Sequence, residues 1–176
     1  MTLARLALSI FFGAMTITGC TSGSGGTVQP DASTCGQFNA DSLTTPTPVT
    51  RAEIDAVFSQ SCSFSTCHGT SPGSGKLYLP KKGAGADDWY AEVMKPSEHI
   101  AGMKRVRPGD PNNSFLLIKM DAHGLCFLAP QCNGDAGALN VDGGSCGESM
   151  PQGSDRLPDT DVAKVASWIR AGAPAN

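Results

Sequence analysis

The stretch Cys62-Ser-Phe-Ser-Thr-Cys67-His68-Gly69 brings together two thiols and an imidazole that directly follows the second thiol. These groups can hold an iron porphyrin covalently, because the thiols add to its two vinyl groups while the imidazole binds the iron. The commonest form of the motif has two residues between the cysteines, whereas this chain has four. The extra residues can bulge outward while both thiols still reach the vinyl groups. The motif therefore predicts haem c attached at Cys62 and Cys67, with His68 as an axial ligand.

Residues 1–19 are predicted to be a lipoprotein signal peptide. Arg5 gives a positive start, and the apolar run over residues 6–17 is too short to span a bilayer as a stable helix. The run leads to Thr18-Gly19-Cys20, which resembles the bacterial lipobox, in which the cysteine is acylated and becomes the new N terminus. A short buried helix with an unrelated cysteine is the alternative. We expect lipidation at Cys20 and a protein anchored by lipid in the cell envelope, periplasmic or surface-facing.

Residues 20–50 are predicted to be a lipidated flexible tether. Residues 21–27 are rich in Gly and Ser, and residues 44–49 are rich in Pro and Thr. Such compositions bury little apolar surface and stay extended or flexible. The folded part is predicted to be one domain over residues 51–176.

The composition predicts a small core and long loops in this domain. The whole chain has 2 Trp, 2 Tyr and 7 Phe, against 21 Gly and 12 Pro. A domain with so few large side chains gains stability from disulfides, a metal or a large flat cofactor. The net charge of −3 offers no basic patch for nucleic acid. The short clusters Lys81-Lys82 and Lys104-Arg105, with Arg107, are expected to be solvated.

Two helices are predicted at the ends of the domain. A capping box at Thr50 and Glu53 begins the first helix, because the hydroxyl and the carboxylate each accept a hydrogen bond from a backbone N–H group that would otherwise be unpaired. Apolar residues then recur at i, i+3 and i+4, and the helix runs to Cys62. The last helix begins near Asp159 and stops at Gly172.

Two more helices are predicted in the middle of the chain. One covers residues 86–95 and is ended by Pro96. The other has Asp110 as its cap and Pro111 at its first position, and it runs to about residue 121. No alternating strand of useful length is found, so the predicted fold class is all-α with long Gly/Pro-rich loops.

A haem iron also takes a ligand on its second face, and Met150 is the favoured candidate. It lies in a loop without helical or strand pattern, is followed by Pro151, and precedes the last helix closely. A loop can bring a thioether to a metal more freely than a helix can. An ordinary loop or core methionine is the alternative. The other candidates are Met94, Met103, Met120, which is more simply a core residue, and His99 and His123, which are expected to be exposed.

The order of these features along residues 51–176 resembles a class I-type mono-haem cytochrome c. The stretches Arg107-Pro-Gly-Asp-Pro-Asn-Asn-Ser-Phe-Leu and Ala166-Ser-Trp-Ile-Arg-Ala-Gly-Ala-Pro174 resemble the cytochrome-c-like domains of exported bacterial lipoproteins. In that family the first and last helices cross and pack, with the haem beneath them. The four-residue spacer between the cysteines departs from the usual family pattern and leaves open whether both thioethers form.

If His68 and Met150 both bind the iron, no coordination position stays open. Such a site suits electron transfer, and a neutral thioether ligand raises the reduction potential. We therefore expect a single-electron carrier whose redox protein partners dock near an exposed haem edge. We do not expect an enzyme. We expect a monomer whose only membrane contact is the lipid, and no binding of nucleic acid.

The cysteine count agrees with this scheme. After Cys20 is assigned to lipid and two cysteines to haem, the four that remain are Cys35, Cys126, Cys132 and Cys146. Four cysteines allow three pairings. One joins Cys126 to Cys132 and Cys35 to Cys146, and the others join Cys126 or Cys132 to Cys146, which would brace the loop of Met150.

Three other interpretations stay open. The first is a haem-free envelope lipoprotein stapled by disulfides, with Cys62 joined to Cys67, that serves as a binding or structural module. The second is a haem enzyme or sensor in which Met150 leaves the iron open. The third is a zinc site made by Cys62, Cys67, His68 and another cysteine.

Overall fold

The computed structural model describes residues 36–45, 47–81, 89–121, 124–128, 131–132, 146–152 and 156–175. The prediction of a helical protein is confirmed within these ranges, which contain no strand and only two isolated bridges, Pro96–Lys104 and Lys104–Ser114. The helices are α1 (Arg51–Ser61), α2 (Trp89–Val93), α3 (Phe115–Asp121), α4 (Leu125–Leu128) and α5 (Asp159–Arg170), with short 3₁₀ turns η2 (Ser74–Lys76) and η3 (Pro111–Asn113).

Helix α1 begins at the predicted capping box. The Thr50 hydroxyl accepts a hydrogen bond from the Glu53 N–H, and the Glu53 carboxylate accepts one from the Thr50 N–H at 2.8 Å. The apolar face that the spacing predicts is buried, with Phe58 only 1% exposed. Cys62 caps the C-terminal end, where its N–H donates to the Phe58 carbonyl. The cysteine motif therefore starts at a fixed point on the end of a buried helix.

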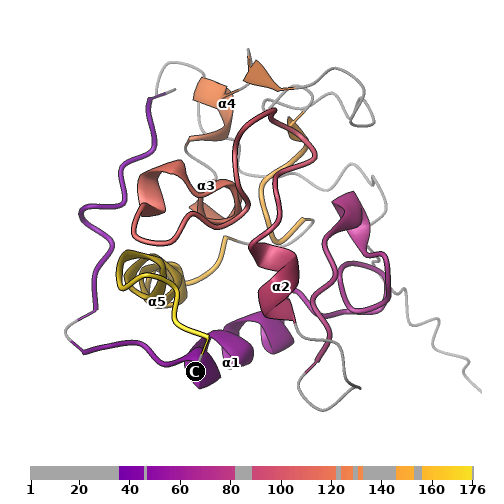
Figure 1. Ribbon diagram of the computed structural model, residues 1–176, viewed down its shortest axis with the longest axis horizontal. Helices are drawn as coiled ribbons and strands as arrows, with labels where there is room; N and C mark the ends of the chain where they lie inside the picture. The colour runs from indigo at the N-terminus through magenta and orange to yellow at the C-terminus, as the bar shows by residue number, and fades with distance from the viewer. Residues whose placement is uncertain are drawn as a thin grey trace, which may run out of the picture.

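An aromatic cluster joins α1, α2 and α5. The Trp89 ring of α2 lies edge-on between Phe58 of α1, with ring centroids 4.9 Å apart, and Trp168 of α5, at 5.7 Å. Edge-to-face pairs of this kind are favoured by the charge distribution of aromatic rings. Helices α1 and α5 are in contact, and Figure 1 shows α2 beside them. Both tryptophans of the chain thus lie where the first and last helices meet.

The middle helices differ from their predicted bounds. Helix α2 ends at Val93, two residues before the predicted end, and the predicted start at residues 86–88 lies outside the described residues. The third predicted helix is divided into η3 and α3 by Ser114, whose backbone is extended. The Ser114 hydroxyl donates to the Asp110 carbonyl and accepts from the Arg107 N–H. These local hydrogen bonds compete with the helical ones and explain the interruption.

The segment that precedes α1 is packed against the domain, in contrast to the flexible tether that its composition predicts. Phe38 and Ala40 are buried, and the Arg170 guanidinium of α5 donates hydrogen bonds to the carbonyls of Ala40, at 2.7 Å, and Leu43, at 3.1 Å. Figure 1 shows this segment running from the neighbourhood of α4 past α5 to α1. The folded unit therefore begins before residue 51. The predicted signal peptide, Cys20 and Cys35 lie outside the described residues.

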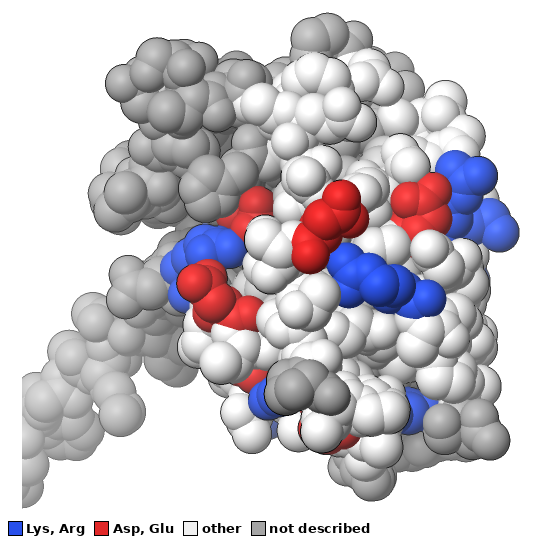
Figure 2. Space-filling view, turned by 90° about the vertical axis from the view of Figure 1, so that its left-hand side faces the viewer, with Lys and Arg blue, Asp and Glu red and all other residues white. Residues whose placement is uncertain are grey.

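The surface that Figure 2 presents carries acidic and basic side chains interspersed, without a large area of one charge. Within the described ranges, no helix combines the length and apolar character that a membrane crossing requires.

We expect Trp89→Ala to destabilise the domain by about 3–5 kcal/mol, because it removes the ring that links Phe58 to Trp168 and leaves a cavity. Urea unfolding followed by circular dichroism measures the change. Phe127→Ala is the control, since that side chain is 44% exposed and its loss should cost about 0.5 kcal/mol or less. Equal losses in the two variants would contradict the role given to the cluster.

Candidate functional site

The cysteine motif folds into a compact loop after α1. The His68 N–H donates to the Cys62 carbonyl at 3.3 Å, and the Gly69 N–H donates to the Phe64 carbonyl at 2.8 Å. A Cβ atom on Gly69 would lie 2.4 Å from the Ser63 carbonyl oxygen, so the loop can close only with glycine there. The four residues between the cysteines are thus used in turns that bring His68 back to the end of α1.

The imidazole of His68 is buried and held in one tautomer. It is 9% exposed, and its Nδ1 lies 2.9 Å from the Leu77 carbonyl oxygen. A carbonyl oxygen can only accept a hydrogen bond, so Nδ1 carries the proton. In the neutral ring, the lone pair of Nε2 is then available to a metal, which is the arrangement that a backbone carbonyl commonly imposes on a ligating histidine.

The surroundings of His68 keep its imidazole neutral. Burial lowers the pKa of His68 below its usual 6.5, although the hydrogen bond to the Leu77 carbonyl opposes this shift. The nearby positive charges of Lys119 and Arg105 lower the pKa further. Because a metal binds the neutral imidazole, this environment favours the form that serves as a ligand.

Arg105 is a buried anchor of this loop, and the expectation that it is solvated is wrong. The residue is 4% exposed. Its guanidinium donates hydrogen bonds to the carbonyls of Glu92, at 3.0 Å, Gly75, at 3.3 Å, and Lys76, at 2.8 Å. The neighbouring Lys104 and Arg107 are exposed, as expected. Arg105 therefore ties α2 to the turn that comes immediately before Leu77, the acceptor of the His68 hydrogen bond.

The two cysteines of the motif are in different states. Cys62 is a free thiol, partly buried against the core, and burial raises its pKa to about 12. Cys67 is disulfide-bonded. The two are therefore not joined to each other, in contrast to the pairing that the haem-free interpretation predicts.

The loop of Met150, defined as residues 146–152, is fastened at several points. Cys146 forms a disulfide with Cys132, one of the pairings that the sequence left open, and this excludes a bond between Cys126 and Cys132. The Met150 N–H donates to the Lys119 carbonyl at 2.8 Å. The Lys119 ammonium donates to the carbonyls of Cys146, at 2.9 Å, and Glu148. Burial lowers the pKa of Lys119 to about 8, partly offset by the charge of Glu148.

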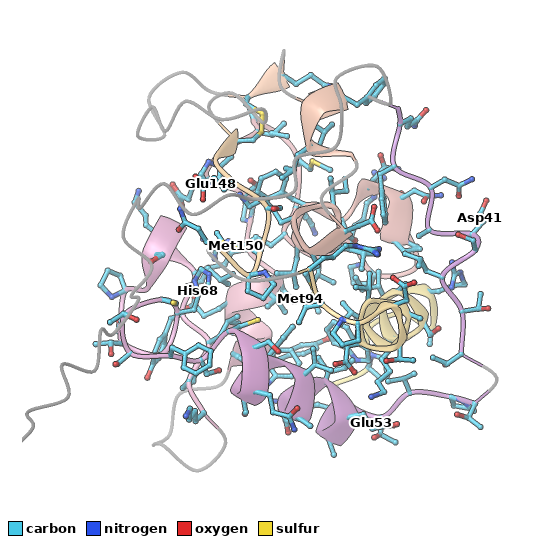
Figure 3. All side chains as sticks on the ribbon, turned by 180° about the vertical axis from the view of Figure 1, so that it is seen from behind. Asp41, Glu53, His68, Met94, Glu148 and Met150 are labelled. Atoms are coloured by element: carbon cyan, nitrogen blue, oxygen red, sulfur yellow. A yellow bond between two sulfur atoms is a disulfide. The ribbon has the colours of Figure 1, made fainter. Side chains whose placement is uncertain are left out.

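In the view of Figure 3, Met150, His68 and Met94 project onto the same part of the molecule. The side chains of Met94 and Met150 are partly buried, and Met120 is a core residue of α3, as predicted. His99 is partly buried rather than exposed, because its ring packs on Phe115 with centroids 5.5 Å apart. His123 and the side chain of Cys126 lie outside the described residues.

A separate groove of about 640 Å³ lies between the segment before α1, the loop at residues 100–104 and the α3–α4 region. Phe38, Met103 and Phe127 contribute to its walls, whereas His68 and Met150 do not. Met103 is therefore placed in this groove, apart from the haem motif. In the described part of the chain, no group of three or more His, Cys, Asp or Glu side chains is arranged to hold a metal ion, and the zinc interpretation finds no support there.

Sequence reasoning missed Lys119 and Arg105. A signal for Lys119 was present, because it is the only cation in the otherwise apolar stretch Phe115–Met120, and all residues of α3 are buried. No local pattern marks Arg105, since its acceptors lie 13 to 30 residues away.

Comparison of the chain with protein-family models, curated sequences and solved structures gave no match. The resemblance to class I cytochromes c therefore rests on the motifs of this chain and on their order.

The pKa shift of His68 predicts how stability depends on pH in the chain without haem. The unfolded imidazole takes up a proton near pH 6.5, whereas the folded one stays neutral to lower pH, so the stability present above pH 6.5 is lost as the pH falls toward the folded pKa. Urea unfolding between pH 5 and 7.5 should show this slope, and His68→Gln should reduce it. An unchanged slope in His68→Gln would rule the contribution out.

Cys62 should resist alkylation in the folded protein, because with a pKa of about 12 only about one thiol in 10⁵ is ionised at pH 7. Unfolding without reductant then separates two cases. A free thiol will take up iodoacetamide, whereas a haem thioether will not. Mass spectrometry of the peptide that contains Cys62 gives the result, and Cys132 and Cys146, which should react only after reduction, are the controls. Fast alkylation before unfolding would show that the thiol is not buried.

Proposed function

We propose that this protein is a membrane-anchored c-type cytochrome that carries single electrons. The haem would be attached through the cysteine motif, with His68 and Met150 as axial ligands. The observation that carries the proposal is the hydrogen bond from His68 Nδ1 to the Leu77 carbonyl, which leaves Nε2 as the metal-binding atom of a buried, neutral imidazole. The bound group would supply the Fe(II)/Fe(III) couple.

The fold supports a cytochrome-c-like domain. Helix α1 leads directly into Cys62 and is in contact with α5, as the family resemblance implies for the first and last helices. The Met150 loop is held on α3 through Lys119, on the side of the molecule where His68 lies (Figure 3). With both ligands on the iron, no position remains open for a substrate. We therefore propose electron transfer to and from redox protein partners, and not enzymatic turnover.

The state of the cysteines limits how the haem can be attached. Cys62 is a protonated thiol that is able to form a thioether. Cys67 can form one only when its disulfide is reduced or has not yet formed. Attachment at Cys67 therefore competes with oxidation outside the cytoplasm. The proposal includes export and acylation at Cys20, which would hold a monomeric domain at the membrane surface.

A second candidate function is a haem-free envelope lipoprotein that binds a partner. The disulfide-bonded state of Cys67 and the Cys132–Cys146 bond favour it, since both are stable staples in an exported chain.

A reduced-minus-oxidised visible spectrum with a pyridine haemochrome assay separates the two candidates. The protein should be made in a host that attaches c-type haem. A sharp α band and a haem that survives acid–acetone extraction are expected for the cytochrome, and the haemochrome band position distinguishes one thioether from two. A protein that matures normally but stays colourless would favour the haem-free lipoprotein.

Met150→Ala should remove the weak band near the red end of the oxidised spectrum, which marks a thioether on the iron. It should also lower the reduction potential by about 0.1 V or more, because axial ligands shift haem potentials over a range of about 0.8 V. Met94→Ala is the matched control, since Met94 is the other partly buried methionine in this region (Figure 3). Loss of the band in Met94→Ala alone would assign the ligand to Met94.

A further inference from the structure

We propose that Lys119 is a positioning residue that fixes the Met150 loop in place beside His68. The proposal rests on the proposed cytochrome function for its spectroscopic consequence, but the placement of the loop can be tested without it.

Lys119 is an unusual residue for its location. It lies in α3, where all seven residues are buried, and it is itself 7% exposed. A buried ammonium is costly unless its donors are paired. Here the donors reach the carbonyls of Cys146 and Glu148, and the ammonium also lies 5.9 Å from the centre of the Phe115 ring. The loop therefore supplies the groups that make a charge at this position tolerable.

The backbone and the side chain of Lys119 hold the same loop. The ammonium binds the carbonyls of residues 146 and 148, and the Lys119 carbonyl accepts the N–H of Met150. Three backbone groups of the loop, at residues 146, 148 and 150, are thus hydrogen-bonded to one residue, Lys119. Gly147 has a φ of +69°, a conformation that other residues rarely adopt, and it allows the chain to turn between the two carbonyls.

The ends of the loop are also attached close to α3. The Cys132–Cys146 disulfide holds the start of the loop. Beyond its end, the Arg156 guanidinium donates to the Asp121 carbonyl at 3.1 Å and pairs with the Asp121 carboxylate. Between these attachments, Lys119 makes three hydrogen bonds with the loop. The positive charge of Lys119 also contributes to lowering the pKa of His68.

Lys119→Met tests the proposal, because it keeps a flexible apolar chain of similar length and removes the charge and the donors. Amide hydrogen exchange in the full protein as purified should become about tenfold faster or more at residues 146–150, the loss expected when hydrogen bonds to a charged group disappear. Lys164→Met is the matched control on α5, where the ammonium pairs with Asp161 across the helix surface, and it should leave the loop unchanged. Lys119→Arg, which keeps a cation and its donors, should restore most of the protection.

In protein that carries haem, Lys119→Met should also weaken the band of the thioether ligand and lower the reduction potential, whereas Lys164→Met should not. Unchanged exchange at residues 146–150 would overturn the proposal, and so would a uniform acceleration that includes α1 and α5, since this would show a merely structural role. If Lys119→Met does not fold, Lys119→Gln tests the charge and the reach of the side chain, because its shorter neutral amide keeps donors but has no charge. A wild-type protein without haem would refute the cytochrome function, while the exchange result would still decide the role of Lys119.

Discussion

Backbone carbonyls that are buried outside helices need hydrogen-bond donors, and the structure depends on how this requirement is met. The described residues contain no strand, so sheet ladders do not provide the donors. Backbone N–H groups in turns and loops provide many of them, and long cationic side chains provide others. Arg105 binds the turn before Leu77, Lys119 binds the Met150 loop, and Arg170 binds the segment that precedes α1. Each cation is stabilised by the carbonyl dipoles that it orders, so the loops and the charges depend on each other.

The aromatic cluster and these cations together determine where the cysteine motif lies. Trp89 links Phe58 to Trp168, and this contact fixes the helix that ends at Cys62. His68 is then buried with its Nδ1 bound to a carbonyl, near the charges of Arg105 and Lys119. Burial first, and then these two positive charges, lower the pKa of the imidazole and favour its neutral form. In the proposed cytochrome, the two charges would also disfavour the more positive ferric state, as a thioether ligand would.

Local interactions explain the parts of the fold that could be predicted. The capping box at Thr50 and the turn at Gly172 involve neighbours in the sequence, and the start of α1 and the end of α5 were predicted correctly from them. The sequence pattern predicts a continuous third helix, but the Ser114 hydroxyl interrupts it through hydrogen bonds that helical periodicity does not reveal. The cysteine motif marks His68 as a candidate ligand, but the tautomer of its ring depends on the Leu77 carbonyl, nine residues later.

By itself, the sequence determined the helical class, the start of α1 and the groups that could hold a haem, because each depends on periodicity, capping or the spacing of a few residues. Only the tertiary structure decided that Phe38 is packed, that Cys146 pairs with Cys132, and that Arg105 and Lys119 are buried. The reason is physical. A cation or a loop can be buried only when its hydrogen-bond partners are present, and here those partners come from distant parts of the chain. For Lys119 and the Cys146 carbonyl, the separation is 27 residues.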